Sequence, residues 1–249
     1  MLYLFYFILG LVVGSFLYEC IDRLPKRQPI VLSHACGHCH ARLQFWDLVP
    51  LLGYLKSHGR CRHCGILVAP PRQPIVELLT GLMFILCLNT FGFSEYFFKS
   101  LVFTCFMIVI TFIDYEWHLI FNNVLVWLAG CGIVINLYIG KIGLPEMFFA
   151  GLLGGGIFLL IAIISKGGFG GGDVKFMAAL GIWLGLKYTL LAFFLTSFFG
   201  GLSAAVLLAL KIKGRKDNIA YGPSMALAAF CALLYGNEII AWYASYFSR

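Results

Sequence analysis

Two aspartates stand where an apolar stretch meets a polar one, and their placement is the first sign of chemistry in this sequence. Asp114 ends an apolar run in "TFIDYEWHLIFNN", and Asp173 follows the glycines of "GGFGGGDVK", which spans Gly167 to Lys175. The chain has only eleven acidic residues, and a carboxylate at membrane depth is costly, which points to a function. Two carboxyl groups a few ångströms apart cannot both ionise. One can then take a proton from water while the other polarises a carbonyl, which is the chemistry of peptide hydrolysis without a covalent intermediate.

The glycines before Asp173 fit such a site. Backbone that is not helical is tolerated at membrane depth only where protein buries it or water lines it, and glycine lets a substrate strand come close. The sequence therefore predicts a hydrated notch at this point. The alternatives are a simple interfacial hinge, and an aspartate that only caps the helix after it.

A second group with chemical potential consists of two Cys-x-x-Cys pairs. The pairs are separated by 21 residues and consist of Cys36, Cys39, Cys61 and Cys64. Four thiolates at this spacing suit a tetrahedral zinc ion and leave no position for a catalytic water, so the prediction is a structural zinc site. His38, His40 or His63 is an alternative to one of the sulfurs. Disulfides and a redox motif are the other interpretations, and a cytoplasmic location disfavours disulfides.

The elements that must position these residues are membrane helices. With 61% hydrophobic and 12% charged residues, the chain is far more apolar than a globular domain, which has about 45–50% apolar residues. Apolar runs that meet or approach the roughly 20 residues of a spanning helix predict an all-α polytopic membrane protein with about eight transmembrane helices. The runs are Leu2–Leu17, Ile75–Phe93, Val102–Ile113, Val124–Ile139, Met147–Ile164, Val174–Leu186, Leu190–Leu210 and Ile219–Phe247.

Three regions follow from this pattern: a first transmembrane helix (1–18), a small zinc-stapled cytoplasmic domain (19–74) and a transmembrane domain (75–249). If the first helix runs inward, 14 of the 18 Lys and Arg residues lie in inner segments, as the positive-inside rule requires. Both termini are then expected outside, and Asp114 and Asp173 near the cytoplasmic boundary. The net charge of +7 is explained by basic loops beside anionic lipids, so no nucleic-acid role is needed.

Several motifs in order resemble those of a known family, the type IV prepilin peptidases, which are intramembrane aspartyl proteases of the Gly-x-Gly-Asp type. The resemblance extends from residue 14 to about residue 229. The similar segments are "GSFLYECIDRLP" (Gly14–Pro25), "DLVPLLGYLKSHGRCRHC" (Asp47–Cys64), "QPIVELLTG" (Gln73–Gly81), "GGGDVK" (Gly170–Lys175) and "YGPSMALAA" (Tyr221–Ala229).

The resemblance implies that Asp114 and Asp173 are the catalytic pair and that the four cysteines bind zinc. It implies a protein of the bacterial inner membrane that removes the short basic leader of pilin-like precursors at the cytoplasmic face. Many members then methylate the new N-terminus from S-adenosylmethionine. Glu77, just inside the second span, is the acidic candidate for this methyl transfer, and an interfacial anchor is the alternative.

Two other functions remain open from the sequence. In a proton-coupled transporter, Asp114 and Asp173 would form a proton relay, but such proteins more often carry internal repeats, and the sequence has none. A zinc-stapled membrane scaffold without catalysis would tolerate asparagine at both positions. A zinc protease is disfavoured because the sequence has no His-Glu-x-x-His element.

Overall fold

Apolar chain in a bilayer must satisfy its backbone hydrogen bonds internally, and the α-helix does so within one segment. The computed structural model describes residues 1–29, 39, 50–51, 54–55, 59–61, 63–66, 71–165, 170–211 and 220–247. Over these residues there are seven helices, each long and apolar enough to cross a membrane. The prediction of an all-α polytopic membrane protein is confirmed.

By its internal contacts the chain forms two compact units, Met1–Val109 and Ile110–Arg249. The boundary lies within helix α5 (Glu95–Trp117). The predicted three-region division at residues 18 and 74 stays a prediction, although the helices on its two sides are now defined. Helix α1 spans Leu2–Arg23 and helix α4 spans Arg72–Phe91.

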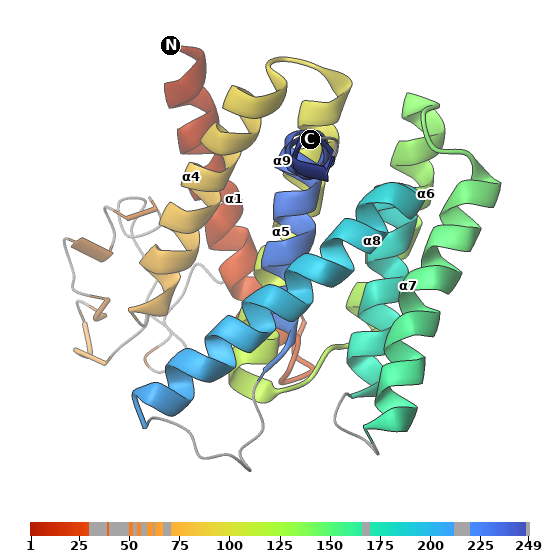
Figure 1. The fold of residues 1–249 in the computed structure, drawn as a ribbon. Helices are drawn as coiled ribbons and strands as arrows, with labels where there is room; N and C mark the ends of the chain where they lie inside the picture. The colour runs from red at the N-terminus through yellow and green to blue at the C-terminus, as the bar shows by residue number, and fades with distance from the viewer. Residues whose placement is uncertain are drawn as a thin grey trace. The chain divides into compact units, whose positions relative to one another are not determined.

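Small residues bring α1 and α4 together in the first unit, where the two helices lie side by side (Figure 1). A Cβ on Gly10 would lie 2.6 Å from the Cα of Gly81, and one on Gly14 would lie 2.6 Å from the Cα of Glu77. Helices in lipid associate by such close backbone contact because hydrophobic burial gives no driving force between them there. The spacing of four residues places both glycines on the face of α1 that meets α4.

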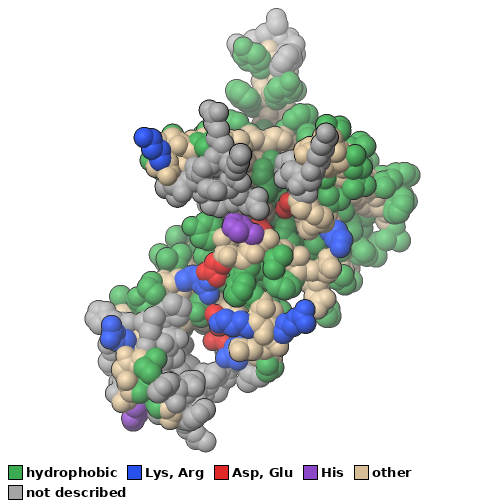
Figure 2. All heavy atoms as spheres, turned by 90° about the horizontal axis from the view of Figure 1, so that it is seen from below, with side chains coloured by type: hydrophobic (Ala, Val, Ile, Leu, Met, Phe, Trp, Pro, Cys, Tyr) green, Lys and Arg blue, Asp and Glu red, His purple; other side chains and the backbone are tan. Residues whose placement is uncertain are grey.

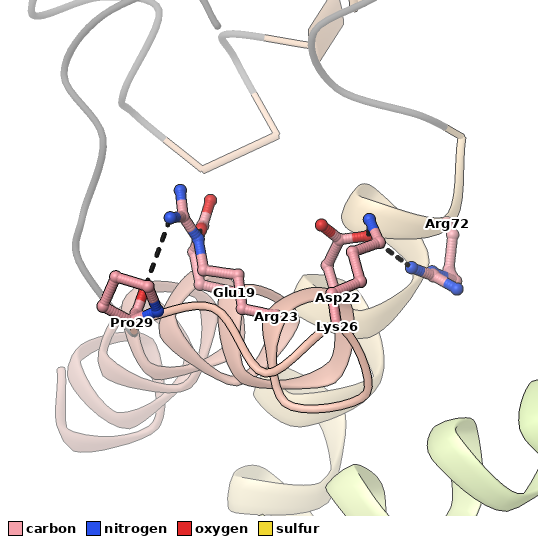
Figure 3. Close-up of polar contacts among 6 residues, drawn as sticks. All are labelled: Glu19, Asp22, Arg23, Lys26, Pro29 and Arg72. Atoms are coloured by element: carbon pink, nitrogen blue, oxygen red, sulfur yellow. Dashed lines mark hydrogen bonds and ion pairs between the residues drawn. The ribbon is translucent and has the colours of Figure 1, made fainter.

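Charged side chains gather where α1 ends and α4 begins (Figure 3). Figure 2 shows Lys and Arg side chains close to Asp and Glu side chains on one face. Asp22 accepts from Lys26 at 2.7 Å and lies 3.6 Å from the guanidinium of Arg72. Glu19 pairs with Arg23, whose guanidinium also donates to the backbone carbonyl of Pro29 at 3.3 Å. Partly exposed pairs of this kind add little stability. Their clustering marks the point at which the apolar part of the two helices gives way to a polar environment.

Helix α8 is the central element of the second unit. The unit contains the end of α5, α6 (Asn122–Ile139), α7 (Leu144–Ile164), α8 (Gly171–Ala209) and α9 (Gly222–Phe247). Helix α8 contacts α6, α7 and α9. Buried polar groups join it to α6: Trp183 Nε1 donates to the carbonyl of Leu128 at 2.6 Å, and Asn136 Nδ2 donates to that of Ile182 at 2.7 Å.

A break at Gly185 divides α8 into two halves. Gly185 has φ 74° and ψ 173°, a backbone conformation that residues with a side chain rarely adopt. The two runs expected at Val174–Leu186 and Leu190–Leu210 correspond to these halves, which run in different directions from the break (Figure 1). The expected count of about eight spans thus becomes seven helices in the described residues, because one tight turn joins two runs into one element.

Candidate active site and metal cluster

Asp114 lies in the last turn of α5 and holds the start of α9. Asp114 is only 5% exposed, and its Oδ2 accepts a hydrogen bond from the backbone N–H of Gly222 at 2.8 Å. Gly222 is the first residue of α9, where backbone N–H groups have no partner within the helix. The carboxylate therefore occupies the positive end of the α9 dipole, which stabilises a negative charge. Glycine is required there, because a Cβ on Gly222 would lie 2.6 Å from Asp114 Oδ2.

Asp173 lies in the first turn of α8, at a second helix N-terminus. Its Oδ2 accepts the backbone N–H of Gly170 at 3.1 Å, while the carbonyl of Gly170 accepts from the N–H of Asp173 at 3.1 Å. This reciprocal arrangement resembles a capping box. Asp173 therefore does cap the start of α8, as one of the two interpretations expected. The side chain is only half-buried, which leaves part of the carboxylate accessible.

The structure brings the two aspartates into one site of the second unit. Asp114 and Asp173 interact electrostatically, as do Asp173 and Tyr221 and also Asp114 and His118. Tyr221 precedes Gly222, and its hydroxyl lies 3.4 Å from the carbonyl of Thr196, to which it donates. Burial, and to a smaller extent the charge of Asp173, raises the pKa of Tyr221 above its ordinary value. The phenol therefore stays protonated at neutral pH beside the carboxylates.

Lys175 follows Asp173 by two residues but bonds to a different partner. Its Nζ donates to Asn122 Oδ1 at 3.0 Å, which joins the start of α8 to the start of α6. Residues two apart on a helix are related by a rotation of about 200° around its axis, so Lys175 and Asp173 lie on different faces of α8. Lys175 is therefore not the counter-ion of the aspartate.

Three of the four predicted zinc ligands come together in the first unit. The sulfur atoms of Cys39, Cys61 and Cys64 all lie within 4.8 Å of one another, and those of Cys39 and Cys61 are 3.7 Å apart. A tetrahedral zinc ion with Zn–S bonds of about 2.3 Å places its sulfurs about 3.8 Å apart, so the donor set fits zinc. Backbone N–H groups of Cys64 and His63 hold the pKa of the Cys61 thiol below its ordinary value, which favours the thiolate that a metal needs. Cys36 lies outside the described residues.

Glu77, in the second turn of α4, is a buried residue. It is 1% exposed, and its carboxylate accepts from Ser15 Oγ at 2.6 Å, from Gln73 Nε2 at 2.9 Å and from the backbone N–H of Leu51 at 2.8 Å. Three donors offset the cost of burying the charge. Through them Glu77 ties α4 to α1 and to the backbone at Leu51. Both carboxylate oxygens face protein donors, and the alternative of an interfacial anchor stays a prediction.

The sequence is similar to known proteins over nearly its whole length. The family model "Bacterial Peptidase A24 N-terminal domain" matches residues 8–91, and "Type IV leader peptidase family" matches residues 101–205. A prepilin leader peptidase/N-methyltransferase of Bacillus subtilis (strain 168) is 32% identical over 246 residues, 95% of this chain and 96% of the relative. The chain belongs to the type IV leader peptidase family.

Other relatives of the leader peptidase family agree with this. Proteins of the same name from Aeromonas hydrophila and Stutzerimonas stutzeri are each 29% identical to the chain. These matches cover 97% and 95% of this chain and 93% and 91% of the relatives. No solved structure matches the chain. Together with the seven apolar helices, family membership indicates a multi-pass inner-membrane protein, and it does not favour the transporter alternative.

Sequence reasoning missed the groups that hold the aspartates. The motif that begins at Tyr221 is part of the family resemblance, yet nothing in its composition links Gly222 to Asp114, 108 residues earlier. A usable signal was the pair Gly222 and Pro223, since proline is favoured in the first turn of a helix. A helix start offers free N–H groups, and a nearby carboxylate is their natural partner.

Proposed function

We propose that this protein is an intramembrane aspartyl endopeptidase that removes the basic leader peptide from type IV pilin-like precursors at the cytoplasmic membrane face. Family membership supports the activity, since the relatives are named prepilin leader peptidases. The observation that supports the mechanism is that Asp114 and Asp173 lie near enough to interact electrostatically, each bonded to a backbone N–H at the start of α9 or α8. The names of the relatives favour this function over the transporter alternative.

In this mechanism the two aspartates share one proton. The ionised carboxylate takes a proton from a water molecule, whose oxygen then attacks the carbonyl carbon of the scissile peptide bond. The protonated carboxyl donates to the carbonyl oxygen and stabilises the negative charge that develops there. When the tetrahedral intermediate collapses, the C–N bond breaks and the leaving nitrogen takes the proton that the base had removed. The N–H groups of Gly222 and Gly170 keep the two side chains oriented throughout.

The orientation in the membrane is part of the proposal. The inner segments hold 14 of the 18 Lys and Arg residues when α1 runs inward, which puts both termini outside. Asp114 lies in the last turn of α5 and Asp173 in the first turn of α8, so the two carboxylates would then lie toward the cytosol. A short basic leader would meet them on that side.

Zinc has a structural place in this proposal. Cys39, Cys61 and Cys64, with Cys36 as the expected fourth ligand, would form a closed shell of thiolates around it. Bound zinc would supply stability to a short polar segment and no catalytic water. The segment between α1 and α4 is too short to bury a core of its own, which is why a metal is needed.

Methyl transfer from S-adenosylmethionine to the new N-terminus is a second proposed activity, and its support is the name of the relatives. No group of described residues presents a defined site for that cofactor. Glu77 as its binding residue stays a prediction, and the three protein donors around its carboxylate support a structural role instead.

The test is cleavage of a pilin-like precursor coexpressed with the full chain. Asp114→Asn and Asp173→Asn should each slow leader removal by about 10²- to 10⁴-fold, because each removes a proton-transfer group. Glu238→Gln is a matched control, since Glu238 is an exposed acidic residue on α9. It should cleave like the wild type. Leader removal at the wild-type rate by Asp173→Asn would refute the mechanism, and the mass of the product N-terminus reports methylation separately.

A further inference from the structure

A groove on the second unit is not used by the proposed reaction. It lies between α6, α7 and the first half of α8 and has a volume of about 740 Å³. This is within the range of about 300–1,000 Å³ that is usual for small-molecule sites. Its walls carry apolar side chains such as Leu125, Leu152 and Ile182, and the polar side chains that line it are those of Asn122 and Lys175. The groove is therefore apolar with a cation at one end.

The groove lies on the opposite side of α8 from the catalytic carboxylate. Lys175, Ala178 and Ile182 line it at helical spacing, while Asp173 points about 200° away from Lys175 around the axis. Asp173 bonds to Gly170, and Lys175 bonds to Asn122. A substrate segment that presents its scissile bond to Asp173 would have to pass around the helix to reach the groove. The groove is thus poorly placed to hold the substrate.

The chemistry of the groove suits one occupant. We propose that it binds an anionic phospholipid, with an acyl chain along the apolar wall and the phosphate at Lys175. Lys175 has three N–H donors, of which Asn122 takes one, and the side chain is exposed. Basic pockets between transmembrane helices on the cytoplasmic side are suited to anionic headgroups. The same lysine would repel a basic leader peptide.

Glycines on α7 make room for the chain. A Cβ on Gly155 would touch the Cβ of Ala178 at 3.0 Å, whereas a Cβ on Gly156 would meet no atom within 4 Å. Both residues line the groove. A larger side chain at Gly156 would therefore project into the groove without overlapping the helices, which makes this position suitable for a test.

The experiment measures lipid binding to the purified full chain by native mass spectrometry in detergent. The probes are phosphatidylglycerol and phosphatidylcholine with identical acyl chains. Wild type should prefer phosphatidylglycerol by about fivefold, which corresponds to one lysine near a lipid phosphate. Lys175→Gln should bind the two lipids equally. Gly156→Leu should weaken the binding of both lipids, because the leucine occupies the space of the acyl chain.

Gly130→Leu is the matched control. Gly130 is exposed on α6, a Cβ there meets no atom within 4 Å, and it does not line the groove, so lipid binding should be unchanged. Asp173→Asn should keep the lipid preference, which separates this inference from the proposed proteolysis. Equal binding of both lipids by wild type, or unchanged binding by Gly156→Leu, would overturn the proposal. Competitive displacement of phosphatidylglycerol by a pilin-like precursor peptide would overturn it too and assign the groove to the substrate.

Discussion

Replacing Gly222 by alanine should impair catalysis without loosening the helix in which it lies. The new methyl carbon would lie 2.6 Å from Asp114 Oδ2 and 3.0 Å from its Cβ and Cγ. The carboxylate must then move, and the 2.8 Å hydrogen bond from the Gly222 N–H is lengthened or lost. Alanine is a better helix former than glycine, so the start of α9 itself should gain from the change.

The magnitude follows from the hydrogen bond. A hydrogen bond to a charged group contributes roughly 1.5–3 kcal/mol, and each 1.36 kcal/mol of lost transition-state stabilisation is tenfold in rate. If the bond holds Asp114 in its reactive position, Gly222→Ala should lower kcat by about 10- to 150-fold. KM should change little, because Gly222 is buried against the aspartate and offers no surface to the substrate.

The assay is leader removal from a precursor in proteoliposomes, with kcat and KM measured separately and unfolding followed in parallel. Gly201→Ala is the matched control, since a Cβ on this exposed glycine of α8 meets no atom within 4 Å. It should leave kcat unchanged. A Gly222→Ala enzyme with the wild-type kcat would show that the position of Asp114 does not depend on this contact. A loss of unfolding free energy as large as the loss of transition-state stabilisation calculated from kcat would refute a local effect.

Two further changes test the fold and the metal cluster. Gly181→Ala should lower the unfolding temperature in detergent by an amount equivalent to about 1–3 kcal/mol, because its Cβ would overlap the backbone of Ala150, and an unchanged temperature would contradict this close contact between α7 and α8. Cys61→Ser should reduce the zinc content from about one ion per chain, measured by elemental analysis of the purified protein, whereas Cys131→Ser in α6 should retain it. Equal zinc in both variants would exclude the cluster as the binding site.

The sequence predicted the acidic pair because charge is rare in this chain. Asp114 and Asp173 each end an apolar or glycine-rich stretch, and the two crossings expected between them would return the chain to the same side. It could not predict what holds them. The bond from Gly222 to Asp114 joins residues 108 apart, and no local pattern encodes a contact of that range. Glu77 illustrates the same limit, since its burial depends on donors from Ser15 and Leu51, remote in sequence.

The helices were predictable for a different reason. Apolar runs in a bilayer have few structures open to them, so their type follows from composition. Their connections depend on single residues. The runs Val174–Leu186 and Leu190–Leu210 were expected as two separate spans, whereas one residue with positive φ, Gly185, suffices to turn the chain within a single helix. The spacing of the cysteines predicted a cluster of four, and the three of them that the structure describes meet.

The short first half of α8 has a consequence for the surrounding lipid. From Gly171 to Gly185 it contains 15 residues, which extend about 22 Å, against a hydrocarbon thickness of about 30 Å. Such hydrophobic mismatch is relieved when the bilayer thins locally around the protein. Thinning at this helix would draw water and headgroups inward toward Asp173, so that, under the proposed mechanism, the deformation of the membrane itself would help to deliver the hydrolytic water.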